Sequence, residues 1–367
     1  MFAGCATEAE DTSAPVDSTE DELRGPGASA SDQRSPELGN DLRVLKASAI
    51  SMAAGIAAAE KIGPVIEAKF ELNDAQALAL SLYPISSPLT VDAQRQTFKE
   101  LAGDPTKAPF SGTTEVFTDQ EHLTRSARDL TLLQLGNKTL SQAVAEVPSS
   151  AGFVFWAIPT MRLGRAGVGI YTAQGNTRQY RFVDGGGSSA HNLWHPADLG
   201  AGPGVKATDQ RTPELGNDLN VLKTAKIKMS AALAEAEEHH GPTIEAKYEI
   251  GDDGKLALSI YPVGKGIATD SERNTFFELS GDPTKAYFQP SKSEFKVPDA
   301  EHLTRSSRDL TLVQSAGFGL RTAVTSAERA IPGGFVYWAI PTIRDTRAGY
   351  GVYVLGADGK SHYLFIS

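Results

Sequence analysis

The chain repeats its own sequence once, and this duplication constrains every fold open to it. Residues 152–160 and 334–342 agree at eight of nine positions, and residues 121–134 and 301–314 differ at two of fourteen. Two shorter segments recur in the same order, 36–42 as 213–219 and 103–108 as 281–286. Solenoid repeats have periods of about 20–50 residues, whereas the offset between these copies drifts from 177 to 182 residues. The pattern therefore predicts a tandem duplication of a whole domain.

A chain of 367 residues is long enough for two such domains, each with its own core. Residues 6–33 lack periodicity and large apolar groups, and Gly, Ser and Pro are frequent between the copies. We therefore expect four segments. They are a disordered acidic tether (1–33), a first repeat domain (34–184), a flexible linker (185–208) and a second repeat domain (209–367).

The charge of the chain is concentrated in the tether. Residues 1–33 carry eight acids and one base, out of a formal net charge of −10. The remainder is nearly neutral, so it has no basic field that would attract nucleic acid. No apolar run approaches the ~18–20 residues of a membrane-spanning helix. Nucleic-acid binding and membrane transport are therefore not expected.

Each copy opens with a predicted helix followed by a predicted β-hairpin. The first helix is expected at 35–63 and its counterpart at 212–241, each bounded by a Ser/Thr-Pro start and a Gly-Pro stop. In the second copy apolar residues alternate with charged ones over 244–250 and continue over 256–260 after an Asp-Gly turn. Such alternation predicts two strands with one buried and one solvated face.

The rest of each copy predicts further helices and a final meander of three strands. Short helices are expected at 91–101 and 270–280, and brief extended pieces near 115–118 and 294–297. Longer helices follow, and strands begin at the Gly-Phe-Val segment. These expectations give an α+β fold of two homologous domains, each an antiparallel sheet covered by helices. The longer helices are predicted at 121–134 and 301–314, and further helices at 140–147 and 320–330. The strands of the final meander in the second copy are predicted at 334–344, 349–356 and 361–366.

Cys5 is the only cysteine, so no internal disulfide can form. Ala3-Gly4-Cys5 before a polar acidic tract resembles the lipobox of bacterial lipoproteins, whose cysteine becomes the lipid-modified N-terminus. That resemblance implies a lipid-anchored protein of the bacterial envelope or periplasm, although the basic and apolar parts of a signal peptide do not precede it. The alternative is a cytosolic protein with an acidic tail and an incidental cysteine.

The end of each copy resembles a PepSY module. The residues that carry this likeness are 322–334, a short helix ending in Ile-Pro-Gly-Gly, followed by strands and the turn Asp358-Gly359-Lys360. The first copy has Pro-Ser-Ser-Ala and Gln-Gly-Asn at the matching places. The front half of each copy, a helix and a hairpin, is similar to the same unit with its third strand displaced. The resemblance implies an extracytoplasmic, non-catalytic module of the kind found in propeptides of thermolysin-like metallopeptidases.

Histidines offer the only candidates for metal or catalytic chemistry. His191 and His195 have the spacing of metal ligands on a helix, and His239 and His240 are adjacent, but neither pair recurs in the other copy. His122 and His302 do recur, without a nearby nucleophile motif. We expect linker and helix-end residues rather than a metal site. A solvated ion pair between Arg125 and Asp129 is expected on the same helix.

Trp156 and Trp338 are the remaining candidates, because each lies in the repeated apolar segment. Burial in the core is one interpretation, and anchoring of a partner near a sheet edge is the other, since aromatic residues dominate binding hot spots. We expect a binding protein with no catalytic residue, cofactor or metal. Its partner would be a protein, for which a secreted metallopeptidase is one candidate, bound at a sheet face or edge. The alternatives are a structural or stress-related envelope lipoprotein and an envelope hydrolase.

Overall fold

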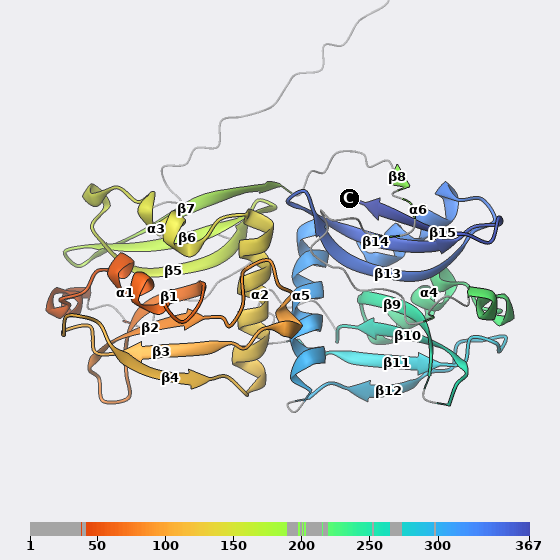
Figure 1. Ribbon diagram of the computed structural model, residues 1–367, viewed down its shortest axis with the longest axis horizontal. Helices are drawn as coiled ribbons and strands as arrows, with labels where there is room; N and C mark the ends of the chain where they lie inside the picture. The colour runs from red at the N-terminus through yellow and green to blue at the C-terminus, as the bar shows by residue number, and fades with distance from the viewer. Residues whose placement is uncertain are drawn as a thin grey trace, which may run out of the picture.

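A computed structural model gives the fold of the chain. It describes residues 42–188, 219–251, 253–264, 274–296 and 299–367, together with the single residues 38, 197, 198, 200, 202 and 215. Cys5, His191 and His195 lie outside these residues, so their predicted roles stay predictions. The described residues form two antiparallel sheets that lie side by side (Figure 1), which confirms the α+β fold.

The first sheet has the strand order β4-β3-β2-β1-β5-β6-β7. Two meanders meet where β1 pairs with β5, through Ala68 opposite Ala157 and Lys69 opposite Trp156. The predicted hairpin and the predicted final meander are both confirmed. The strands are β1 (Val65–Leu72), β2 (Leu78–Pro84), β3 (Lys99–Gly103), β4 (Gly112–Val116), β5 (Phe153–Arg162), β6 (Arg165–Gln174) and β7 (Thr177–Ser188).

The second sheet repeats this order as β12-β11-β10-β9-β13-β14-β15 and adds the short strand β8 (Ala197–Asp198) beside β15. Strand β7 continues to Ser188, so the segment predicted as linker contributes backbone to both sheets. The strands of the second sheet are β9 (Thr243–Ile250), β10 (Leu256–Pro262), β11 (Phe277–Gly281), β12 (Ser291–Glu294), β13 (Phe335–Arg344), β14 (Arg347–Leu355) and β15 (Ser361–Ile366).

The long opening helix predicted for each copy is wrong, because the segment is broken in two. A 3-10 helix (η2, Leu42–Ala47) is followed by an irregular step and then α1 (Met52–Ala59). Ser48 donates its hydroxyl to the Ile50 carbonyl at 2.7 Å, and Ser51 caps α1 by accepting from the Ala54 N–H. Serine side chains of this kind compete with helical hydrogen bonds. The second copy is broken in the same way into η5 (Leu219–Thr224) and α4 (Met229–His240), although Ala225 and Lys228 replace the two serines. The feature common to both breaks is a backbone hydrogen bond of 2.9 Å, from the Ala49 N–H to the Pro105 carbonyl and from the Lys226 N–H to the Pro283 carbonyl.

The short helix predicted at 91–101 is also wrong. Only a 3-10 turn, η3 (Ala93–Arg95), forms there, and the chain then enters β3. The Gln96 amide donates to the carbonyls of Pro88 and Val91, both at 3.2 Å. These bonds shape a loop, and the following residues pair with β2. In the second copy the described part of the corresponding segment, from residue 274, leads directly into β11.

Helices α1 and α3 (Leu140–Ala145) pack on β1 and on each other, and α4 and α6 (Leu320–Ala330) pack in the same way in the second copy. Each sheet has its own large apolar core. The remaining helices, α2 (Gln120–Gly136) and α5 (Ala300–Ala316), confirm the helices predicted there. They lie next to each other at the centre of the molecule (Figure 1).

Contacts between the repeats combine apolar and polar groups. An apolar cluster joins three residues of the first repeat (Leu132, Leu135, Ala166) to three of the second (Leu312, Ile343, Ala348). Ser307 donates its hydroxyl to the Thr124 carbonyl at 2.5 Å. The buried Arg308 reaches Asp92 of the first repeat, with Nε 3.8 Å from Oδ1. These contacts fix the orientation of one sheet relative to the other.

Candidate binding edges

The outermost strands β4 and β12 are the most exposed strands whose side chains the structure describes. All five residues of β4 and all four of β12 are exposed. Each strand is hydrogen-bonded on one side, β4 to β3 and β12 to β11. Both strands lie at the same end of the molecule, at the bottom of Figure 1. A strand at a sheet edge presents backbone N–H and C=O groups that a further strand can bind.

The register shows which backbone groups point outward. Phe117 donates its N–H to the Phe98 carbonyl at 3.0 Å, so these two residues form a hydrogen-bonded pair. Such pairs alternate with non-hydrogen-bonded pairs along an antiparallel ladder. Glu115 therefore bonds to Glu100 across the ladder, while the N–H and C=O groups of Thr114 and Val116 face away from β3.

The second repeat has the same arrangement. Phe295 donates its N–H to the Phe276 carbonyl at 3.0 Å. By the same alternation, Ser293 bonds toward β11 and the backbone groups of Lys292 and Glu294 face outward. The two edges therefore offer equivalent backbone positions, Thr114 and Val116 in one and Lys292 and Glu294 in the other.

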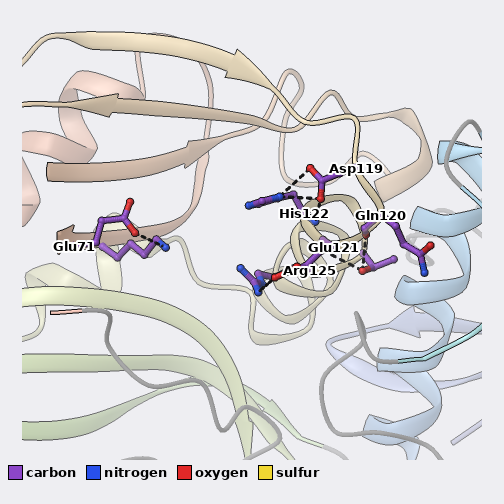
Figure 2. Close-up of polar contacts among 8 residues, drawn as sticks. Glu71, Asp119, Gln120, Glu121, His122 and Arg125 are labelled. Atoms are coloured by element: carbon purple, nitrogen blue, oxygen red, sulfur yellow. Dashed lines mark hydrogen bonds and ion pairs between the residues drawn. The ribbon is translucent and has the colours of Figure 1, made fainter. Parts of the chain in front are cut away.

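A ring stack holds the end of each edge strand in place. The buried ring of Phe117, directly after β4, lies 5.7 Å from the Tyr83 ring and 4.4 Å from the His122 ring, centroid to centroid. His122 is fixed in turn by Asp119, whose carboxylate lies 2.9 Å from Nδ1 (Figure 2). In the second repeat Phe295 lies 6.0 Å from Tyr261 and 4.8 Å from His302. The phenylalanine directly after each exposed strand is thus held in place by ring contacts to a tyrosine and a histidine of other segments.

Asp119 also caps helix α2, because its carboxylate accepts the His122 backbone N–H at 3.0 Å. Burial acts to raise the pKa of Asp119, but the hydrogen bonds from the His122 backbone and ring outweigh it and hold that pKa below its usual value. A lowered carboxyl pKa stabilises the fold at neutral pH and loses this effect as the pH falls through the lowered pKa. The hydrogen bonds between Asp119 and His122, which support the ring stack after β4, are therefore intact at neutral pH.

A second duplicated network lies on the strands behind each edge. Trp156 donates its indole N–H to Glu67 at 2.8 Å, and Lys69 pairs with Glu71 at 2.6 Å. Ser81 donates its hydroxyl to Glu71. The counterparts Trp338 and Glu245 lie 2.9 Å apart, and Lys247 and Glu249 lie 2.6 Å apart. Ser81 is 1% exposed, which keeps a substrate away from its hydroxyl, so the network favours a structural role over nucleophilic catalysis.

Both tryptophans lie inside the protein. Trp156 is 4% and Trp338 is 3% exposed. Each lies on an inner strand of its sheet, β5 or β13, and is stacked on Tyr171 or Tyr353. This placement favours the first of the two interpretations that the sequence left open. Anchoring of a partner by either indole would require the ring to leave this position.

The polar residues predicted on α2 have different partners from those expected. Arg125 pairs with Glu121 at 2.7 Å (Figure 2). Asp129 is 1% exposed and pairs with the buried Arg128 at 2.8 Å. The predicted solvated pair of Arg125 with Asp129 is therefore wrong, because α2 lies between its own sheet and α5 and buries Asp129.

The other histidine candidates give no metal site among the residues described. His239 lies 3.7 Å from Glu235, and burial holds the pKa of His240 below its usual value. Within the described ranges no three or more His, Cys, Asp or Glu side chains are placed to share a metal ion. The same ranges contain no helix with the length and apolar character needed to cross a membrane.

The loops that connect the edge strands to their neighbours contain a further carboxylate with a shifted pKa. The hydroxyl of Thr106, the ammonium of Lys107 and the Thr106 backbone N–H bind Asp104 and lower its pKa to about 2. We expect Asp104 to titrate near pH 2 in a carboxyl-carbon NMR titration, and Thr106→Val to move that midpoint toward the usual 3.8. The stability that this turn supplies is complete above pH 3.8 and is lost as the pH falls toward 2. An unshifted midpoint in the unaltered protein would contradict the hydrogen-bonded turn.

Sequence reasoning did not identify Thr114, Phe117, Lys292 or Phe295 as site residues. The extended pieces near 115–118 and 294–297 were predicted, but their position at a sheet edge depends on strand order. Comparisons with protein-family models, with curated proteins and with solved structures found no significant match to this chain.

Proposed function

We propose that this chain is a non-catalytic binding protein that takes up an extended segment of a partner protein by strand addition at β4 and β12. In strand addition the backbone of the partner supplies hydrogen bonds along the edge, and alternate side chains supply specificity. The single observation that supports this proposal most strongly is the exposure of both edge strands, each with a ring stack at its end. Pre-organisation of this kind reduces the ordering cost of binding.

Natural edge strands are also kept short as a protection against aggregation, and β4 and β12 have five and four residues. An edge strand of this length can pair with only a few residues of another strand. It therefore favours binding of a short partner segment over extended strand pairing of the kind found in fibrils. The resemblance to PepSY modules makes a thermolysin-type metallopeptidase one candidate partner. A passive structural role is the alternative, and it requires no uptake of peptide.

Selection of random octapeptides displayed on phage tests strand addition with the full chain. We expect enrichment on the unaltered protein and at least tenfold lower recovery on the double variant Thr114→Pro/Lys292→Pro. Proline removes an N–H that faces outward, and it is tolerated at an edge strand when that N–H faces solvent. The matched control Thr114→Ala/Lys292→Ala keeps both N–H groups and should recover phage as well as the unaltered protein does.

Circular dichroism would confirm that the proline variant is folded. Equal recovery on the folded proline variant, or no enrichment on the unaltered protein, would contradict strand addition and favour the structural alternative. A titration of thermolysin activity with the full chain tests the peptidase reading separately. Stoichiometric inhibition supports it, and full activity at a large molar excess removes thermolysin-type enzymes as partners.

A further inference from the structure

The two binding edges differ in charge. In the first repeat Glu115 of β4 lies directly opposite Glu100 of β3. In the second repeat the matching position holds Ser293, opposite Glu278. Like charges directly opposite each other on one face of a sheet are destabilising. The first edge therefore retains an unfavourable pair that the second edge lacks.

Each carboxylate of this pair has no ion-pair or hydrogen-bond partner in the described part of the chain, whereas the neighbouring carboxylates do. Glu71 is paired with Lys69 at 2.6 Å, and Asp104 with Lys107 at 3.0 Å. Glu278 of the second repeat accepts the Tyr261 hydroxyl at 3.2 Å. Negative charge at the first edge is thus concentrated at Glu100 and Glu115.

A groove of about 530 Å³ runs along the same face of the first sheet. Small side chains such as Ala79 and Ala102 line it, and Glu71, Glu100 and Asp104 are among the residues around them. A long side chain of an added strand can extend over Glu115 into this groove. Adjacent strands are about 4.8 Å apart, so a lysine or arginine side chain on the partner reaches both Glu115 and Glu100.

The position facing Glu115 suits such a side chain for a second reason. Because the backbone groups of Glu115 bond to β3, the residue opposite it on an added strand would form a non-hydrogen-bonded pair. Side chains in these pairs are closer than in hydrogen-bonded ones. A basic residue there would replace the repulsion between the two glutamates by attraction to both.

Building on the proposed strand addition, we propose that the edge of the first repeat selects a basic extended segment, with a lysine or arginine opposite Glu115, and that the edge of the second repeat does not. The two repeats then have different partners or bind different parts of one partner. The outward-facing backbone positions of the two edges are equivalent, so the backbone does not distinguish them. Charge complementarity with Glu115 and Glu100 therefore selects the basic segment for the first edge.

Two labelled octapeptides test the proposal with the full chain carrying Lys292→Pro, which leaves the first edge as the binding edge. In one peptide lysine alternates with valine and threonine, and in the other glutamine replaces lysine. We expect the lysine peptide to bind about three- to tenfold more tightly at low salt, as cross-strand ion pairs allow. The preference should decline toward equality at 0.5 M salt, where surface charges are screened.

Charge-neutral variants separate this selectivity from strand addition itself. Glu100→Gln/Glu115→Gln should remove the preference, so that the two peptides bind with equal affinity. Ser293→Glu in a chain carrying Thr114→Pro should create the preference at the second edge, because it restores the opposed glutamates there. Equal affinity of the two peptides for the first edge would overturn the charge selection while leaving strand addition intact. Loss of binding by both peptides and by the phage library would instead reject strand addition.

Discussion

Replacing Arg308 with methionine is expected to lower the free energy of unfolding by about 3–5 kcal/mol, as removal of one partner of a buried ion pair does. The guanidinium is fully buried, and its Nη1 lies 2.6 Å from Asp309 and 3.3 Å from the Pro341 carbonyl. Methionine fills much of the same volume but removes the guanidinium that lies 2.6 Å from the buried Asp309 carboxylate. Urea denaturation followed by circular dichroism measures the loss.

The double variant Arg308→Met/Asp309→Leu is the matched control. This variant removes both members of the close ion pair and should recover most of the lost stability, as replacement of buried ion pairs by apolar residues often does. A single-variant loss below about 1 kcal/mol would mean that water reaches Asp309 and that the interface between the repeats is looser than described. Arg128→Met makes the corresponding change in the first repeat, where Arg128 and Asp129 are 2.8 Å apart.

Replacing Trp338 with alanine is expected to cost about 3–5 kcal/mol, in the range of large core truncations. Its ring stacks on Tyr353 with centroids 5.3 Å apart, and its indole N–H bonds to the buried Glu245. Alanine would leave a cavity and remove one hydrogen bond from the buried Glu245 carboxylate. Trp338→Phe should cost less, since it keeps most of the packing and loses the hydrogen bond. Chemical denaturation of both variants gives the two values.

The same experiment decides between the two interpretations of the tryptophans. A core residue loses stability on truncation, whereas an anchor for a partner loses binding while stability is kept. We therefore expect Trp338→Ala and Trp156→Ala to unfold at lower denaturant concentration. Unchanged stability with lost recovery of the phage peptides would support partner anchoring instead.

Parts of the fold follow directly from local sequence. The alternation over residues 244–250 predicts a strand because side chains on successive residues point to opposite faces, and β9 lies there. The helix predicted at 121–134 forms as α2. The predicted opening helices are wrong because each copy breaks where a backbone N–H bonds to a distant carbonyl, from Ala49 to Pro105 and from Lys226 to Pro283. Apolar periodicity does not reveal such a contact.

The candidate site was less accessible to sequence reasoning than the fold. The pattern near 115–118 indicates extended backbone, and nothing local shows that the strand has a neighbour on one side only. The Tyr83, Phe117 and His122 stack joins residues from three separate segments. Asp129 is buried beside α5 and pairs with the buried Arg128, which local spacing cannot reveal.

The sequence by itself determined the duplication, the α+β class and most strands, because identity between segments and hydrophobic alternation are local properties. Tertiary structure alone decided that β4 and β12 are edges, that Trp156 and Trp338 are enclosed, and that Arg308 is buried against the other repeat. Strand order, burial and interfacial charge depend on contacts between residues far apart in the chain. The opposed Glu100 and Glu115 show the difference: both are visible in the sequence, but only the register places them face to face.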